Sequence, residues 1–121
     1  MGASTQDLIR TAVERFLAEV PALAQLKLVF GLELRGRGDV QIFRVELPGP
    51  QISKAVADDA RIEVSLPRSD FNGLAAEGHI KDYRQAFETG HLKIQGNQQI
   101  MRLVGQVIEK QEARARTKKV H

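Results

Sequence analysis

Two stretches of alternating apolar residues constrain the fold of this chain more than any other feature. In residues 26 to 34 an apolar side chain falls on every second position, and the pattern resumes from Val40 to Leu47. Successive side chains of a β-strand point to opposite faces, so a period of two predicts a strand with one buried face. The intervening Gly36, Gly38 and Asp39 are typical of a turn. The sequence therefore predicts a β-hairpin with one buried face.

Helical spacing of apolar residues predicts helices at both ends of the chain. Ser4 or Thr5 can cap a first helix from about Thr5 to Val20, before Pro21 disfavours helical geometry. Asn97 is expected to cap a long last helix whose apolar stripe stops at Ile108. Two shorter helices are expected at about residues 69 to 76, capped by Ser69 or Asp70, and 82 to 89.

Further strands complete the expected set of elements. Residues 51 to 57 form a weak strand pattern, residues 61 to 66 a clearer one, and residues 92 to 94 a short one between two glycines. The first helix, the strands and the later helices together indicate an α+β protein. At 121 residues, the chain is expected to form a single domain over 1–121 with one core.

Composition excludes several classes of chemistry. The chain has no cysteine, which rules out disulfides, thiolate metal sites and a cysteine nucleophile, and which is compatible with a cytoplasmic location. No apolar run approaches the ~20 residues of a membrane-spanning helix, and the first residues lack the apolar region of a secretion signal. We therefore expect a cytoplasmic protein.

The basic charge is concentrated in a tail. Of the 18 basic and 15 acidic side chains, residues 110 to 121 hold five basic and one acidic, which leaves 13 basic and 14 acidic in residues 1 to 109. The expected basic helical tail at about 110–121 complements the helix dipole at a C-terminus, and its simplest interpretation is a solvated helix end. The alternative is transient contact with an anionic membrane surface. Nucleic acid is not expected as a partner, because the tail has no aromatic residue to stack on bases.

The short motifs favour structural interpretations. Arg37-Gly38-Asp39 spells an integrin-binding tripeptide, but Gly-Asp between two strands is turn chemistry, and Asp58-Asp59 is interpreted as a solvated turn because calcium needs more oxygen ligands. The three histidines lie on different elements with no metal-ligand spacing, and no nucleophile or phosphate-binding motif accompanies them. The sequence predicts no catalytic residue, no metal site and no cofactor.

A longer motif lies between Phe71 and Val107. Its most specific part is the run Ala86-Phe87-Glu88-Thr89-Gly90-His91-Leu92-Lys93-Ile94-Gln95-Gly96-Asn97. This run resembles the sterol carrier protein type two family, also called the non-specific lipid-transfer proteins. The family pattern is an Ala-Phe pair, two variable residues, Gly-Lys-Leu-Lys-Ile, one variable residue, and Gly followed by Asn or Asp. The sequence departs from it at His91, where lysine is usual.

The resemblance implies a fold and a ligand class. The implied fold is a five-stranded mixed, largely antiparallel sheet, with helices covering one face and an apolar tunnel between them that the last helix partly closes. The implied function is binding, and intracellular transfer, of an apolar fatty acyl, sterol or isoprenoid ligand, without catalysis. The residues predicted to line the tunnel, here called the wall residues, are Phe16, Phe30, Leu32, Leu34, Val45, Ile62, Val64, Phe71, Leu74, Phe87, Ile94, Leu103, Val104 and Val107.

Two other functions stay open at this point. An accessory module could present a lipid-like or quinone-precursor substrate to partner enzymes, which the sequence does not identify. A small hydrolase would need Ser, His and carboxylate side chains that converge only in the folded chain. Apolar periodicity is the same for a filled core and for an open cavity, so the tunnel depends on the resemblance alone.

Overall fold

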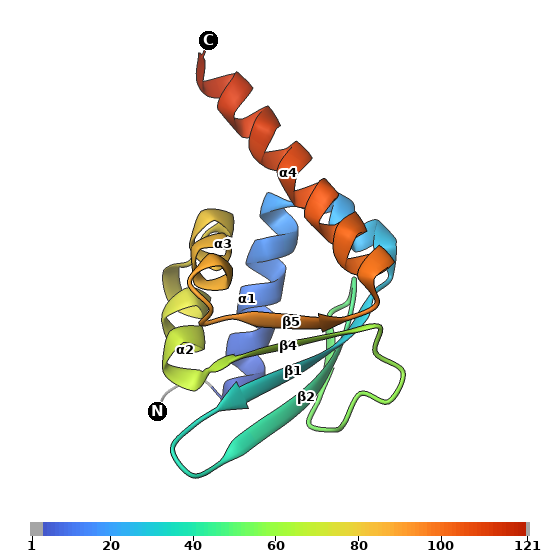
Figure 1. Cartoon of the computed structure of the whole chain (residues 1–121), viewed down its shortest axis with the longest axis vertical. Coiled ribbons are helices and arrows are strands. Elements are labelled where there is room, and N and C mark those ends of the chain that lie inside the picture. The colour runs from blue at the N-terminus through green and yellow to red at the C-terminus, as the bar shows by residue number, and fades with distance from the viewer. Residues whose placement is uncertain (1–3, 121) are drawn as a thin grey trace.

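The computed structural model describes residues 4 to 120, with side chains described up to residue 115. A bent sheet is flanked by helices, and the last helix projects away from the body (Figure 1). The elements, in chain order, are α1 (Thr5–Glu19), the 3-10 helix η1 (Pro21–Leu26), β1 (Val29–Arg35), β2 (Val40–Glu46), β3 (Gln51–Ser53), β4 (Ile62–Pro67), α2 (Arg68–Glu77), α3 (Ile80–Glu88), β5 (Lys93–Gly96) and α4 (Gln98–Val120).

The five strands form one mixed sheet in the order β3-β2-β1-β4-β5. The expected hairpin is present, with Leu32 of β1 opposite Phe43 of β2. β3 and β5 are the edge strands and pair antiparallel with β2 and β4. Within residues 4 to 120 the one parallel pairing joins β1 to β4, with Phe30 beside Ile62. The predicted α+β class and the largely antiparallel five-stranded sheet are confirmed.

Helices cover one face of the sheet, as predicted. Alternate residues of β1, β2 and β4 are buried there against Ile9 and Ala12 of α1 and Phe71 and Ala75 of α2. The side chains between them, such as Glu33, point to the opposite face. Removal of the apolar face from water, at roughly 25 cal/mol per Å², is the main contribution that holds the helices on the sheet.

Side-chain caps begin the first and last helices, as the sequence predicts. The Ser4 hydroxyl accepts a hydrogen bond from the Asp7 backbone N–H at 3.1 Å, and the Asn97 side-chain oxygen accepts one from the Ile100 N–H at 3.1 Å. Each cap satisfies a backbone donor that has no partner within the helix. Gly90, with φ of 84°, follows α3 in the left-handed conformation that commonly ends a helix.

Several predicted boundaries were wrong. β3 ends at Ser53 rather than at residue 57, and the first strand begins at Val29 because η1 occupies residues 21 to 26. Neither Ser69 nor Asp70 caps α2, because this helix follows β4 directly and its N-cap position is Pro67. α3 begins at Ile80 rather than at residue 82, because the Asp82 carboxylate accepts the His79 N–H at 2.8 Å and stabilises an earlier start.

Two acidic turn residues have specific partners. Asp39 lies 2.8 Å from the Arg68 guanidinium, so the carboxylate of the Arg-Gly-Asp tripeptide ties the hairpin turn to α2. Asp59 accepts two hydrogen bonds from Arg44, at 3.0 and 2.7 Å, and this contact holds the pKa of Asp59 below its ordinary value. The Asp58-Asp59 turn is therefore anchored to the outer face of the sheet rather than only solvated.

Candidate functional site

A second apolar cluster lies where the C-terminal end of α1, η1, the start of α3 and the middle of α4 meet. Its buried members are Val20, Leu23 and Ile80. Half-buried side chains pack on these three: Phe16, Leu17, Leu26, Val104, Val107 and Ile108. We call this region the α4 junction. To this cluster α4 contributes only half-buried side chains, Val104, Val107 and Ile108, whereas α1, η1 and α3 each contribute a buried one or lie next to it.

The stripe on α4 continues from the α4 junction to the main core. Ile100, Met101 and Val104 pack against the cluster between sheet and helices. Spacings of three and four residues place these side chains on one face of α4 together with Val107 and Ile108. α4 thus packs on the end of the core, and its apolar face stays in partial contact with water.

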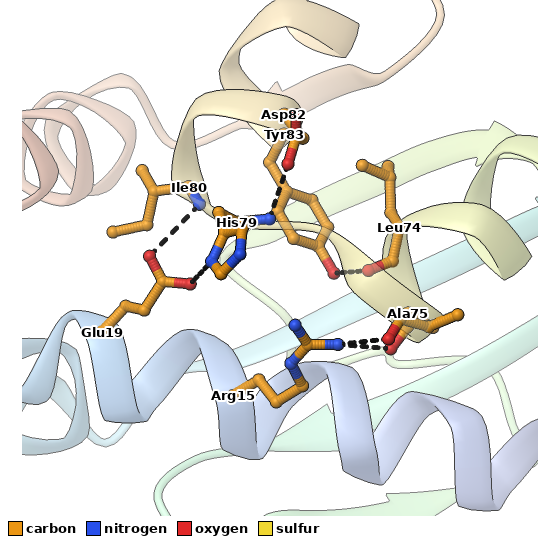
Figure 2. A network of polar contacts seen from close by, with 9 residues as sticks. Arg15, Glu19, Leu74, Ala75, His79, Ile80, Asp82 and Tyr83 are labelled. Carbon is orange, nitrogen blue, oxygen red and sulfur yellow. Dashed lines mark hydrogen bonds and ion pairs between the residues drawn. The ribbon is translucent and has the colours of Figure 1, made fainter.

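Polar contacts fix α2 and α3 on α1 next to the α4 junction (Figure 2). The Arg15 guanidinium donates to the carbonyl oxygens of Ala75 and Ala76, at 3.3 and 2.5 Å, near the end of α2. Glu19 meets the start of α3: one carboxylate oxygen lies 2.9 Å from His79 Nδ1 and the other accepts the Ile80 N–H at 3.4 Å. These contacts hold the α3 side of the junction in place, while α4 lies against it mainly through apolar side chains.

Tyr83 stands between the two apolar clusters. Its ring meets Phe16 edge to face, with ring centroids 5.3 Å apart, and its hydroxyl donates to the Leu74 carbonyl at 3.4 Å. Burial raises the pKa of Tyr83 to about 12. The chain has one tyrosine and no tryptophan, so Tyr83 dominates the intrinsic fluorescence and reports on this site.

The structure divides the predicted wall residues into three groups. Buried in the main core are Leu32, Leu34, Val45, Ile62 and Phe71. Half-buried against one or both clusters are Phe16, Phe30, Val64, Leu74, Ile94, Val104 and Val107. Phe87 and Leu103 are exposed, at 50% and 40%. Of this half-buried group, Phe16, Val104 and Val107 lie at the α4 junction, and the role of the group as the wall of a ligand site stays a prediction.

Several members of this region were not among the predicted wall residues. Of the α4 junction these are Leu17, Val20, Leu23, Leu26, Ile80 and Ile108. Tyr83 and Met101, which pack against the main core, were not predicted either. A signal for three of them was present, because Ile80, Tyr83 and Phe87 follow one another at three- and four-residue spacing along one helix face, as do Val104 and Ile108. Ile80 was overlooked because the predicted start of α3 was two residues too late, at residue 82.

Among the described residues, two surface hollows lie outside the α4 junction, the first of mixed polar and apolar lining and the second polar. A groove of about 620 Å³ between α2 and α3 is lined by Asp70, Glu77 and Asp82 among others, and of the predicted wall residues only Leu74 borders it. A hollow of about 240 Å³ on the outer face of the sheet is lined by charged and polar side chains, including Glu33, Arg35 and Lys93. Neither is an apolar tunnel, so the apolar tunnel also stays a prediction.

Two other kinds of site are absent from the part of the chain that the structure describes. Among the residues that the structure describes, no group of three or more His, Asp or Glu side chains is placed to hold a metal ion. Within the same part of the chain, no helix combines the length and the apolar character needed to cross a membrane. The α4 junction, with its half-buried aliphatic and aromatic side chains, is suited to contact with an apolar molecule.

Comparison with known proteins agrees with this geometry. Residues 9–109 match the family model of the SCP-2 sterol transfer family. A sequence comparison with individual curated proteins gives no significant match. Solved structures with this fold include the sterol carrier protein domain 2 of Helicoverpa armigera, with a TM-score of 0.60 and 13% identity over 92% of this chain and 94% of that one.

Two further structures have the same fold at similar identity. The palmitated sterol carrier protein 2 like 2 of Aedes aegypti has a TM-score of 0.56 and 20% identity, over 83% of this chain and 93% of that one. The apo form of sterol carrier protein 2 from Yarrowia lipolytica has a TM-score of 0.54 and 20% identity, over 75% and 82%. The family match covers most of the chain and the expected sheet is present. The chain therefore belongs to the SCP-2 sterol transfer family of lipid-binding and lipid-transfer domains.

Proposed function

We propose that this chain carries the apolar part of a single lipid-like molecule beneath α4. The observation that carries the proposal is the half-buried stripe of α4, because it leaves a contiguous apolar surface that a bound ligand would bury further. A ligand under α4 would complete the burial of Met101, Val104 and Ile108. Each methylene moved from water into this site stabilises the complex by about 0.8 kcal/mol before the cost of association.

The proposed action needs no catalytic group. Transfer requires that the ligand enter and leave, and α4 is the element whose displacement would expose the site. The polar contacts of Arg15 and Glu19 keep α2 and α3 on α1 while α4 moves. We propose the cytoplasm as the compartment, which the lack of cysteine supports.

A titration followed by Tyr83 fluorescence tests the proposal. Acyl, sterol and isoprenoid ligands are added to the protein, and native mass spectrometry measures the stoichiometry. We expect saturable binding of one molecule of at least one class. The variant Val104→Asn, which places an amide in the half-buried stripe, should weaken this binding about tenfold or more.

Arg102→Asn is the matched control, because Arg102 is an exposed residue of the same helix. It should bind as the wild type does. If no class binds in either assay, or if both variants bind as the wild type does, the proposed site beneath α4 is wrong.

The outer part of α4 is proposed to meet the membrane during transfer. α4 projects from the body (Figure 1), and its described basic side chains Lys110 and Arg114 are exposed. The remaining basic residues of the predicted tail lie beyond the described side chains. Co-sedimentation should then be stronger with phosphatidylserine vesicles than with phosphatidylcholine vesicles, and salt should weaken it. Equal sedimentation with both kinds of vesicle would contradict this part of the proposal.

A further inference from the structure

An ion pair joins α3 to α4 at the outer end of the apolar stripe. The Arg84 guanidinium of α3 contacts the Glu112 carboxylate of α4. Ile80 and Ile108 belong to the same apolar cluster, and Arg84 and Glu112 each lie four residues further along the same two helices. Because residues four apart share a helix face, the ion pair directly continues the apolar contact between α3 and α4.

The burial of this pair differs from that of the others. Glu112 is only 18% exposed, and it is the least exposed carboxylate among the ion pairs of the described side chains. Arg84 is 40% exposed and is flanked on its own helix face by Ile80 and Phe87. A carboxylate in partly apolar surroundings is costly unless a cation pairs with it. Arg84 thus provides a place at the edge of the apolar stripe where one carboxylate is stabilised.

The neighbouring groove between α2 and α3 is lined by more acidic than basic side chains. Asp70, Glu77 and Asp82 line the groove between α2 and α3, and their negative charge disfavours an anionic group there. At the α4 junction, in contrast, the residue one helical turn beyond Ile80 is the positively charged Arg84. An amphipathic anion whose tail lies along the apolar stripe therefore has one favourable place for its charged end on this side of α3.

We propose that Arg84 binds the carboxylate end of a single-chain fatty acid, and that Glu112 occupies Arg84 when no ligand is present. The inference rests on the proposed function, because it places the tail of the ligand beneath α4. On binding, one carboxylate replaces another on the same guanidinium, so the number of paired charges at Arg84 is conserved. Glu112 is released to water, and α4 loses a polar contact to α3. An acidic lipid thereby loosens the helix that covers it.

Dodecanoate and dodecanol are matched probes, because they share one tail and differ in the charged end. Binding is measured by Tyr83 fluorescence, under conditions in which the acid is ionised and both probes are monomeric. The wild type should bind dodecanoate several-fold more tightly than dodecanol, by less than the about tenfold of a newly added charge-assisted hydrogen bond, because the contact with Glu112 is lost in exchange. Arg84→Gln should abolish this preference and leave the dodecanol affinity unchanged within about twofold.

Glu112→Gln removes the competing carboxylate. This variant should bind dodecanoate several-fold more tightly than the wild type, at an unchanged dodecanol affinity. Arg102→Gln, an exposed residue on α4, lowers the net charge by the same amount as Arg84→Gln and should keep the wild-type preference. Circular dichroism of each variant verifies that it is folded.

The outcomes distinguish the proposed headgroup site at Arg84 from the proposed function of lipid binding beneath α4. If the wild type binds both probes without preference, or if Arg84→Gln keeps the preference, the headgroup site is wrong while the proposed function stands. An equal loss of both probes in Arg84→Gln, or the same change in Arg102→Gln, would assign Arg84 a structural or general electrostatic role and overturn the inference. If acyl, sterol and isoprenoid ligands all fail to bind, the proposed function itself fails.

Discussion

Gly96 is the residue on which the placement of α4 depends most directly. It ends β5 immediately before Asn97, the cap of α4, and its φ of 134° belongs to a region that residues with a side chain rarely adopt. A Cβ atom at this position would press on the Arg61 carbonyl oxygen and lie 2.8 Å from the Ile62 Cα. The same Arg61 oxygen accepts the Asn97 N–H at 2.9 Å. Gly96→Ala must therefore disturb the start of α4.

The expected cost has two parts. Backbone strain at such a φ costs about 1 to 3 kcal/mol, and the overlap with Arg61 and Ile62 costs about 1 to 3 kcal/mol more. We expect Gly96→Ala to lower the free energy of unfolding by about 2 to 6 kcal/mol, a large part of the 5 to 15 kcal/mol typical of a domain. Urea unfolding followed by far-ultraviolet circular dichroism measures this change.

Two other glycines are matched controls. Gly90 has a φ of 84° but open space around a Cβ, so Gly90→Ala should cost only the strain, about 1 to 2 kcal/mol. Gly105 lies within α4 with no atom near its Cβ position, so Gly105→Ala should raise stability by about 0.5 to 1 kcal/mol through helix propensity. A loss for Gly96→Ala no greater than that for Gly90→Ala would refute the steric argument.

Two further measurements test the environment of the α4 junction and of the core. Tyr83, the only tyrosine, should ionise in the folded protein with a midpoint at about pH 12, against an ordinary value of 10.0, in an absorbance titration of its phenolate. The pKa of Tyr83 is higher in the folded than in the unfolded protein. Its contribution to stability is therefore complete below the unfolded pKa and is lost as the pH rises through the folded pKa. A folded midpoint at the ordinary value would contradict the burial of Tyr83. Leu34→Ala, at a side chain with 0% exposure, should lower the free energy of unfolding by about 2 to 5 kcal/mol. Ile42→Ala, at a strand residue with 41% exposure, should cost less than about 1 kcal/mol, and similar losses for the two would refute the assignment of inner and outer faces.

The features that the sequence predicted correctly are those with a local physical cause. The period of two in β1 and β2 follows from backbone geometry, and the opposing pairs such as Leu32 and Phe43 confirm the hairpin. Ser4 and Asn97 cap their helices through contacts only three residues away. The motif that ends at Gly96-Asn97 indicated the family and, with it, the order of the last elements.

Features that depend on distant parts of the chain were not predictable from the pattern. The parallel pairing of β1 with β4 places Phe30 beside Ile62. The early start of α3 at Ile80 combines a local cap from Asp82 with contact to Glu19 on α1. A pattern of apolar and polar residues records which face of an element is buried, but it does not record which element will lie against that face.

The sequence by itself therefore determined the family, the strands and helices, and which of their faces are apolar. Only the tertiary structure decided how completely each face is covered: Leu34 is fully buried in the core, whereas Val104 on the apolar face of α4 is only half-buried. It also brought Arg84 and Glu112 together from two helices. The physical reason is that periodicity arises within one element, whereas burial and ion pairing arise from the packing of elements that are far apart in the chain.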